Sequence, residues 1–218
     1  MGGQPKALLP FGGEALIERQ IKELRKACEE IIVVSQDVRI SAYLSDYDGV
    51  TIVQDLIQES GPLGGMHAAF NSSSCDIHWV VGSDMPFLSS RAALFMVEIK
   101  QAAGSAAVVP HINGKTHPLH GVYSRGCLAS LQQLLEERRL RVMEFLREIQ
   151  AIELKEEAFA ERGIPIRFVV NANTPEDYER ALSIYKEQIK QNRSHHPPCS
   201  AATRAGSGSL ENGDDHRS

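Results

Sequence analysis

The sequence contains few cysteines, no long apolar run and no excess of positive charge. Its four cysteines, Cys28, Cys75, Cys127 and Cys199, are widely spaced without a CxxC pair, and no secretory leader is recognisable, so we expect reduced thiols in a cytoplasmic protein. No apolar run approaches the ~20 residues that span a bilayer, which argues against a membrane protein. The net charge of -5 argues against a nucleic-acid binder driven by positive charge and favours a small anionic ligand.

Apolar β-branched runs alternate with amphipathic patterns along most of the chain. The runs that predict strands are 31–35, 50–55, 77–84, 105–110 and 166–173. The patterns that predict helices are 14–28, 89–103, two helices within 127–149 that separate near 139–141, and 173–191, where Thr174 is the expected cap. Strands buried on both faces are typical of parallel sheets covered by helices. We therefore expect one three-layer α/β/α, Rossmann-like domain over residues 1–191, with a mostly parallel sheet.

The composition changes at residue 192. Residues 192–218 are rich in Ser, Gly, Pro and His and almost without large apolar side chains, which predicts a disordered tail. His195, His196 and Cys199 have metal-ligating side chains, but a flexible tail offers no preformed second shell, so we expect no metal site there.

The first nine residues, MGGQPKALL, read as the second half of a phosphate-binding loop. Two glycines allow the backbone to approach an anion closely, and Lys6 supplies a mobile positive charge. Such a loop normally follows a buried strand, and none precedes it in this sequence. We therefore expect that the first strand of the sheet is missing.

Two aspartates follow strand-like runs, where ligands of open α/β sheets bind. Asp84 ends the run 77–84, and we predict that it binds Mg²⁺, which prefers oxygen ligands; a turn carboxylate is the alternative. Asp55 ends another run and precedes GPLGGM at 61–66. Asp55 and the glycines, Gly64 among them, are predicted to bind a nucleotide, against the alternative of a glycine-rich turn with a capping aspartate.

Four weaker candidates come from other segments. His117 is a possible substrate contact, although His117 and His120 have opposite parity in a strand, which weakens a metal site formed by both. Arg139 belongs to a basic cluster that suits a substrate phosphate or is simply a solvated turn. Asn171 and Asn173 would share one face of their expected strand and reach a ligand, unless this segment serves only to cap the last helix.

Taken in order, these motifs resemble one family. MGGQPKALLPFGG, Asp55 with GPLGGM, VVGSDMPFL, HPLHGVY, RRLRVMEFL and VVNANTPEDY are similar to the molybdenum cofactor guanylyltransferases over residues 1 to about 190. GPLGG and SDMPF alone would indicate a broader group of nucleotidyltransferases, including cytidylyltransferases of the same cofactor pathway. The pair RRLRVMEFL and NANTPED narrows the resemblance to the guanylyl branch.

The resemblance implies transfer of GMP from Mg-GTP to molybdenum-bound molybdopterin, with release of pyrophosphate and with cofactor-insertion proteins and molybdoenzymes as further partners. It implies that Lys6 contacts the GTP phosphates, that Asp55 contacts the guanosine, and that Asp84 holds Mg²⁺ and nucleotide. Arg139 and His117 would face the pterin. Family members also begin with a strand and a glycine-rich loop, and this sequence begins inside that loop.

Two other functions remain open from the sequence. One is a related nucleotidyltransferase that uses CTP or activates a sugar phosphate. The other is a non-catalytic remnant that binds molybdopterin or a partner enzyme without turnover, because part of the glycine-rich loop is absent from the sequence.

Overall fold

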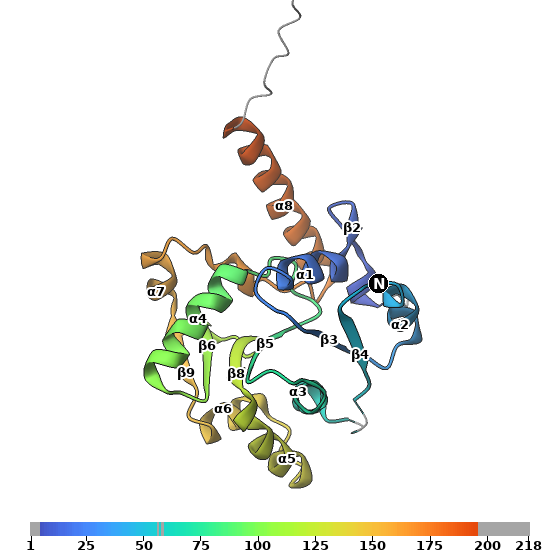
Figure 1. The fold of residues 1–218 in the computed structure, drawn as a ribbon. Helices are drawn as coiled ribbons and strands as arrows, with labels where there is room; N and C mark the ends of the chain where they lie inside the picture. Colours follow the sequence, from blue (N-terminus) through green and yellow to red (C-terminus); the bar gives the residue numbers. More distant parts are fainter. Residues whose placement is uncertain (1–4, 56, 58, 196–218) are drawn as a thin grey trace, which may run out of the picture.

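The computed structural model describes residues 5–195, except for positions 56 and 58 (Figure 1). Its helices are α1 (Leu16–Leu24), α2 (Val38–Leu44), α3 (Gly61–Ser72), α4 (Ser90–Ala103), α5 (Leu128–Glu136), α6 (Val142–Glu148), α7 (Glu156–Glu161) and α8 (Pro175–His195). Its strands are β1 (Pro10–Phe11), β2 (Glu14–Ala15), β3 (Ile31–Val34), β4 (Val50–Val53), β5 (Ile77–Val81), β6 (Ala107–Ile112), β7 (Lys115–Thr116), β8 (His120–Ser124) and β9 (Ile152–Lys155). Short 3-10 helices are η1 (Lys6–Leu8), η2 (Arg125–Cys127) and η3 (Ile166–Val169).

The central strands form two separate ladders. β3 pairs with β4 in parallel, while β5, β8, β6 and β7 form a larger sheet in that order, with β9 parallel to β6. β8 is antiparallel to both β5 and β6, so the larger sheet is mixed rather than mostly parallel. The reason is local: the turn at Asn113 and Gly114, both with positive φ, sends the chain straight back instead of through a crossover helix.

Helices cover both faces of this sheet, which confirms the three-layer α/β/α fold. Successive residues of a strand point to opposite faces, so Val109 and Tyr123 pack with α3, α5 and α6, whereas Val108 and Val122 pack with α4, α7 and η3. All four side chains are fully buried. In Figure 1, α1 and α4 lie above the strands and α3, α5 and α6 below them.

The segment 166–173 was expected to be a strand, and this prediction is wrong. Residues Ile166–Val169 form η3, and the following residues have no strand pairing among the described residues. Phe168 is fully buried against the face of the sheet, so packing buries this apolar segment although it does not pair as a strand. The segment then passes Asp84, whose carbonyl accepts a hydrogen bond from the Ala172 amide at 2.7 Å.

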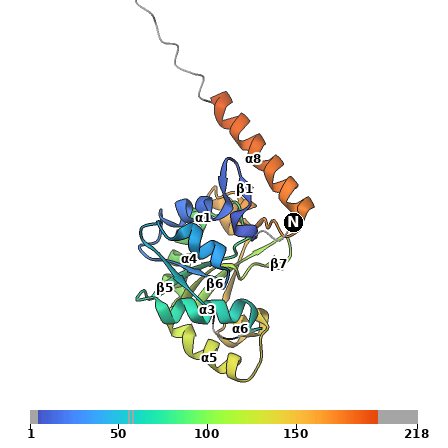
Figure 2. The ribbon, with the colours of Figure 1, turned by 90° about the vertical axis from the view of Figure 1, so that its right-hand side faces the viewer.

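Helix α8 projects away from the layers, as Figure 2 shows. Thr174 caps it as expected, since its Oγ1 accepts a hydrogen bond from the Asp177 amide at 3.1 Å. The helix continues to His195, beyond the expected domain boundary at residue 191, and the remainder of the expected tail lies outside the described residues. Among the described residues, no helix is both long and apolar enough to cross a membrane.

His120 is fully buried between the rings of Trp79 and Phe168, and neither ring nitrogen has a hydrogen-bond partner among the described residues. This burial lowers the pKa of His120 from 6.5 to about 4. As the pH falls, His120 is protonated in the unfolded chain at a higher pH than in the folded protein. The free energy of unfolding therefore decreases between pH 6.5 and pH 4, by about 3 kcal/mol in total.

We expect His120→Leu to remove this loss while leaving stability near pH 7.5 unchanged or higher. Urea unfolding at pH 4.5 and pH 7.5 would measure it. Some acid sensitivity should persist, because burial also lowers the pKa values of His78 and His117. If the free energy of unfolding of the variant depends on pH as strongly as that of the original chain, His120 is not the responsible group.

Candidate active site

The turn after β5 presents Asp84 at the carboxyl end of the strand. Asp84 is half-buried, and its carboxylate accepts no hydrogen bond from the described part of the chain, so its oxygens can bind a ligand. The backbone around it is held firmly. The side-chain amide of Gln20 on α1 donates to the carbonyls of Gly82 and Met85 at 2.8 and 3.0 Å.

Three further predicted site residues lie at the same place. The bond between Ala172 and Asp84 brings the segment that carries Asn171 and Asn173 to the Asp84 turn. Lys6 Nζ donates to Asn173 Oδ1 at 3.1 Å, which adds the amino-terminal segment. The Asn171 Oδ1 atom is buried without a hydrogen-bond partner in the described residues. The segments that carry Lys6, Asp84 and the two asparagines are far apart in sequence and therefore meet at one end of the sheet.

Asp55 accepts hydrogen bonds from residues at the start of α3. Its Oδ1 accepts from the Ile57 amide at 3.0 Å and its Oδ2 from Ser60 Oγ at 2.8 Å. Gly64 lies directly against this pair, because a Cβ atom at that position would be only 1.7 Å from Ser60 Oγ. Asp55 thus caps a glycine-rich turn, which was the alternative to nucleotide binding. It also positions the N-terminus of α3, whose free amides favour an anion.

His117 lies outside β8, in the turn that precedes it. Its amide donates to the Pro110 carbonyl at 2.8 Å, and its Nε2 lies 3.4 Å from the Ile112 carbonyl. Burial lowers the pKa of His117, so the ring is neutral near pH 7 and offers hydrogen bonds rather than charge. Among the described residues, His117 forms no hydrogen bond with Asp84 or Lys6.

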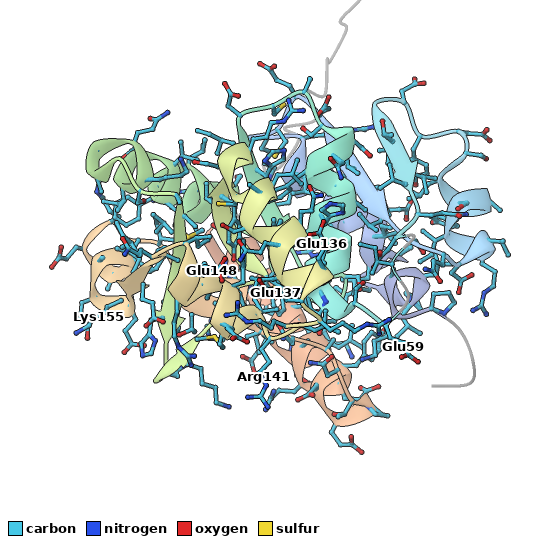
Figure 3. The ribbon with its side chains drawn as sticks, turned by 90° about the horizontal axis from the view of Figure 1, so that it is seen from below. Glu59, Glu136, Glu137, Arg141, Glu148 and Lys155 are labelled. Carbon is cyan, nitrogen blue, oxygen red and sulfur yellow. The ribbon has the colours of Figure 1, made fainter. Side chains whose placement is uncertain are left out.

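Arg139, which was predicted to contact a substrate phosphate, has carboxylate partners in the structure. It forms ion pairs with Glu137 at 2.8 Å, Glu144 at 2.7 Å and Glu148 at 3.5 Å. Figure 3 shows Glu137 and Glu148 at the α5–α6 end of the molecule. Hydrogen bonds to Glu137 and Glu144 raise the pKa of Arg139, and its ion pairs join the end of α5 to α6.

We expect Arg139→Ala to lower the thermal midpoint at pH 7, because three glutamates would then repel one another without a counter-charge. The effect should shrink towards pH 4, since Arg139 lowers the pKa of Glu137 and that stabilisation is lost as the carboxylate is protonated. Arg141→Ala is the matched control, because Arg141 is exposed and has no ion pair among the described residues. A loss of nucleotide or pterin affinity at unchanged stability would contradict this structural role.

Gln20 is a site residue that was not predicted from the sequence. It lies on the apolar stripe of α1 with Ile17, Ile21 and Leu24, and it is only 5% exposed. A polar residue within a buried stripe needs hydrogen-bond partners, and that signal was present in the helical pattern. The partners, Gly82 and Met85, could be identified only from the fold.

We expect Gln20→Met to lower the free energy of unfolding by about 1–3 kcal/mol, because two buried carbonyls lose their hydrogen-bond donor. It should also reduce kcat/KM by at least about tenfold, since the Asp84 turn would no longer be held in place. Urea unfolding and steady-state kinetics measure the two effects, with Gln132→Met on the exposed face of α5 as control. Full activity in the destabilised variant would mean that Gln20 supports the fold alone.

A model of the MobA-like NTP transferase domain matches residues 1–152. Together with the α/β fold and the polar cluster at the carboxyl end of β5, this match defines the class: the chain is a nucleotidyltransferase. The probable molybdenum cofactor guanylyltransferase of Pelotomaculum thermopropionicum is 34% identical over 180 residues, covering 82% of this chain and 84% of the relative. The chain belongs to the MobA-like NTP transferase family, which confirms the resemblance seen in its motifs.

Other comparisons agree with this assignment. The probable molybdenum cofactor guanylyltransferase of Bacillus subtilis is 29% identical, covering 81% of this chain and 85% of that protein. The solved structure of molybdopterin-guanine dinucleotide biosynthesis protein A from Archaeoglobus fulgidus superimposes with a TM-score of 0.73 at 22% identity, over 85% of this chain and 92% of that one. A Thermus thermophilus 2-C-methyl-D-erythritol 4-phosphate cytidylyltransferase shares the fold at a TM-score of 0.61 and 15% identity, over 84% of this chain and 95% of that one.

Proposed function

We propose that this nucleotidyltransferase transfers GMP from GTP to the phosphate of molybdenum-bound molybdopterin in the cytoplasm, releasing pyrophosphate. The observation that carries the proposal is the meeting of Lys6, Asp84, Asn171 and Asn173 at one end of the sheet, in a chain whose relatives are named molybdenum cofactor guanylyltransferases. The product would pass to cofactor-insertion proteins and molybdoenzymes.

The donor atoms at this site suit Mg²⁺. The Asp84 carboxylate has no partner among the described residues, and the buried Asn171 Oδ1 has none either. Both are hard oxygen ligands, and Mg²⁺ commonly takes only one or two carboxylates from a protein, with the remaining positions filled by phosphates and water. When bound, the ion would supply positive charge to the GTP phosphates. Asp84 and Asn171 are the residues that would hold it.

The reaction needs no covalent enzyme intermediate. An oxygen of the molybdopterin phosphate attacks the α-phosphorus of GTP, the new P–O bond forms, and the bond to the β-phosphate breaks, so that the electron pair leaves with pyrophosphate. Lys6 would neutralise charge on the phosphates as the two anions approach each other. Asp55, Gly64 and the N-terminus of α3 would hold the nucleotide, and His117 and Asn173 would contact the acceptor.

The first experiment measures pyrophosphate release with Mg²⁺, molybdopterin carrying molybdenum, and GTP or CTP in parallel. Activity with GTP, at least about a hundredfold above CTP, is the expected result. Preference for CTP would transfer the chain to the cytidylyl branch, and release with a sugar phosphate in place of molybdopterin would identify a sugar nucleotidyltransferase. A folded chain that binds molybdopterin but releases no pyrophosphate with any nucleotide would be the non-catalytic remnant.

A further inference from the structure

Arg19 on α1 contacts the backbone of the Asp84 turn, residues 82–86. Its Nε donates a hydrogen bond to the Pro86 carbonyl at 2.8 Å. Gln20, the next residue of α1, donates to two other carbonyls of the same turn. Two consecutive side chains of one helix therefore hold this turn, and the proposed function assigns no role to Arg19.

The guanidinium of Arg19 lies against aromatic rings from two other elements. Its Cζ atom is 4.7 Å from the ring centre of Tyr185 on α8 and 5.7 Å from that of Phe11 on β1. The carboxylate of Glu14 is a weaker partner, because it lies 3.9 Å from the guanidinium. A planar guanidinium can stack on a ring and still donate hydrogen bonds from its edge. The two rings therefore orient Arg19 towards the Pro86 carbonyl.

Tyr185 is itself held by close packing. Its ring centre lies 5.4 Å from that of Phe11, which is fully buried. The ring occupies the space that glycine leaves at position 12, because a Cβ atom on Gly12 would overlap it. Phe87, which directly follows the Asp84 turn, packs edge-on against Phe11 at 5.7 Å. Figure 1 shows α8 beside α1 and the β1–β2 hairpin, where these rings meet.

Helix α8 therefore reaches the Asp84 turn by two routes. The segment before the helix binds Asp84 through Ala172, and Tyr185, further along the helix, contacts the guanidinium that binds Pro86. We propose that Arg19, oriented by Tyr185, is a positioning residue that places the Asp84 carboxylate for the metal ion of the nucleotide. A displacement of about 1 Å at such a group is enough to lower a rate about a hundredfold. The role of Arg19 rests on the one proposed for Asp84, and it does not depend on which nucleotide or acceptor reacts.

The first test compares Arg19→Met with the original chain. Methionine keeps an unbranched side chain that packs against both rings, and it removes the hydrogen-bond donor and the charge. We expect the Mg²⁺ concentration for half-maximal GTP binding to rise at least about fivefold, with GTP binding in the absence of Mg²⁺ unchanged. Isothermal titration measures both. Amide exchange across residues 82–87, measured without nucleotide, should accelerate at least about tenfold.

A double variant separates positioning from general damage. If Arg19 acts through Asp84, adding Arg19→Met to Asp84→Asn should change the remaining Mg²⁺-dependent binding of GTP by less than about twofold. Losses that multiply in the double variant would show that Arg19 acts independently of Asp84, and would overturn the proposal.

Substitutions of Tyr185 test the origin of the orientation. Tyr185→Phe keeps the ring and should bind Mg²⁺ and GTP as the original chain does. Tyr185→Leu removes the ring and should reproduce at least about half of the Arg19→Met effect, on a logarithmic scale. Equal binding by the phenylalanine and leucine variants would mean that the ring does not orient Arg19, which contradicts the proposal.

Arg162→Met is the matched control. Arg162 also lies over an aromatic ring, that of Phe95 at 4.8 Å, and it pairs with Glu98 at 3.4 Å. Among the described residues, it forms no hydrogen bond with the Asp84 turn. We expect this variant to lose thermal stability without any change in the Mg²⁺ dependence of GTP binding.

The outcomes distinguish this role from the transfer reaction itself. If Arg19→Met lowers the thermal midpoint as Arg162→Met does, while its amide exchange at 82–87 is unchanged, Arg19 only supports the fold and the proposal is wrong. If the expected shifts in Mg²⁺ dependence and amide exchange are found in a chain that releases no pyrophosphate, the positioning role stands and the proposed reaction fails.

Discussion

Replacing Asp84 with asparagine is expected to abolish most of the transfer activity while leaving the fold intact. The substitution keeps the shape of the side chain and removes the negative charge of the carboxylate that we propose to bind Mg²⁺. Removing one group that stabilises charge in a transition state typically reduces the rate by about 10²–10³-fold, and we expect an effect of this size when Mg²⁺ is bound less well. Because the Asp84 carboxylate has no hydrogen-bond partner among the described residues, no stabilising contact is broken, and the thermal midpoint should stay within about 2 °C.

Two measurements separate this outcome from general damage. Isothermal titration should show that Asp84→Asn binds GTP in the presence of Mg²⁺ at least about tenfold more weakly, with little change in its absence. Asp48→Asn, which removes an exposed carboxylate on the segment before β4, should behave as the original chain does. If Asp84→Asn keeps both its Mg²⁺ dependence and its rate, the ion is held elsewhere and the assignment of Asp84 is wrong.

Gly64→Ala is expected to damage both stability and nucleotide binding, although alanine is the better helix former. A Cβ atom would lie 1.7 Å from Ser60 Oγ and 2.4 Å from Asp55 Oδ2, and Ser60 is only 1% exposed, so the hydroxyl has little room to move. The bond between Ser60 and Asp55 must break or the first turn of α3 must shift. We expect a loss of about 1–3 kcal/mol in the free energy of unfolding and weaker binding of GTP.

The neighbouring glycine provides a sharp control. Apart from its chain neighbours and the backbone of its own helix, no heavy atom of the described residues lies within 4 Å of a Cβ placed on Gly65, so Gly65→Ala should be neutral or stabilising by up to about 1 kcal/mol. Urea unfolding and GTP titration of the two variants make the comparison. Adding Ser60→Gly to Gly64→Ala should recover part of the loss, because the nearest clashing atom is removed. Equal behaviour of the two alanine variants would refute the steric argument.

Local sequence patterns predicted the elements well where each element depends on its own residues. The strands at 31–35, 50–55 and 77–84, the helix pair within 127–149 and the capped last helix are present, with small differences at their ends. Hydrophobic periodicity and capping act between residues only a few positions apart, so they can be identified without knowledge of the fold.

The predictions that failed are those that depend on long-range partners. The run 166–173 has strand composition, yet Phe168 packs against the sheet face and the segment joins no ladder. The binding of a substrate phosphate by Arg139 stays a prediction, but its partners Glu144 and Glu148, whose side chains reach it only when α6 folds beside α5, could not be identified from the sequence. Neither burial nor ion pairing between elements can be predicted from composition alone.

By itself, the sequence determined the alternation of strands and helices, since hydrophobic periodicity is a local property of the chain. Its ordered motifs carried the resemblance to the family, which the match of the MobA-like NTP transferase domain model confirms. Only the tertiary structure decided that Lys6 and Asn173 meet beside Asp84 and that Gln20 supports the turn there. It also decided that β3 and β5, which belong to different ladders, line the same cavity. The physical reason is that hydrogen bonds, ion pairs and other contacts between distant segments form only when the layers pack together.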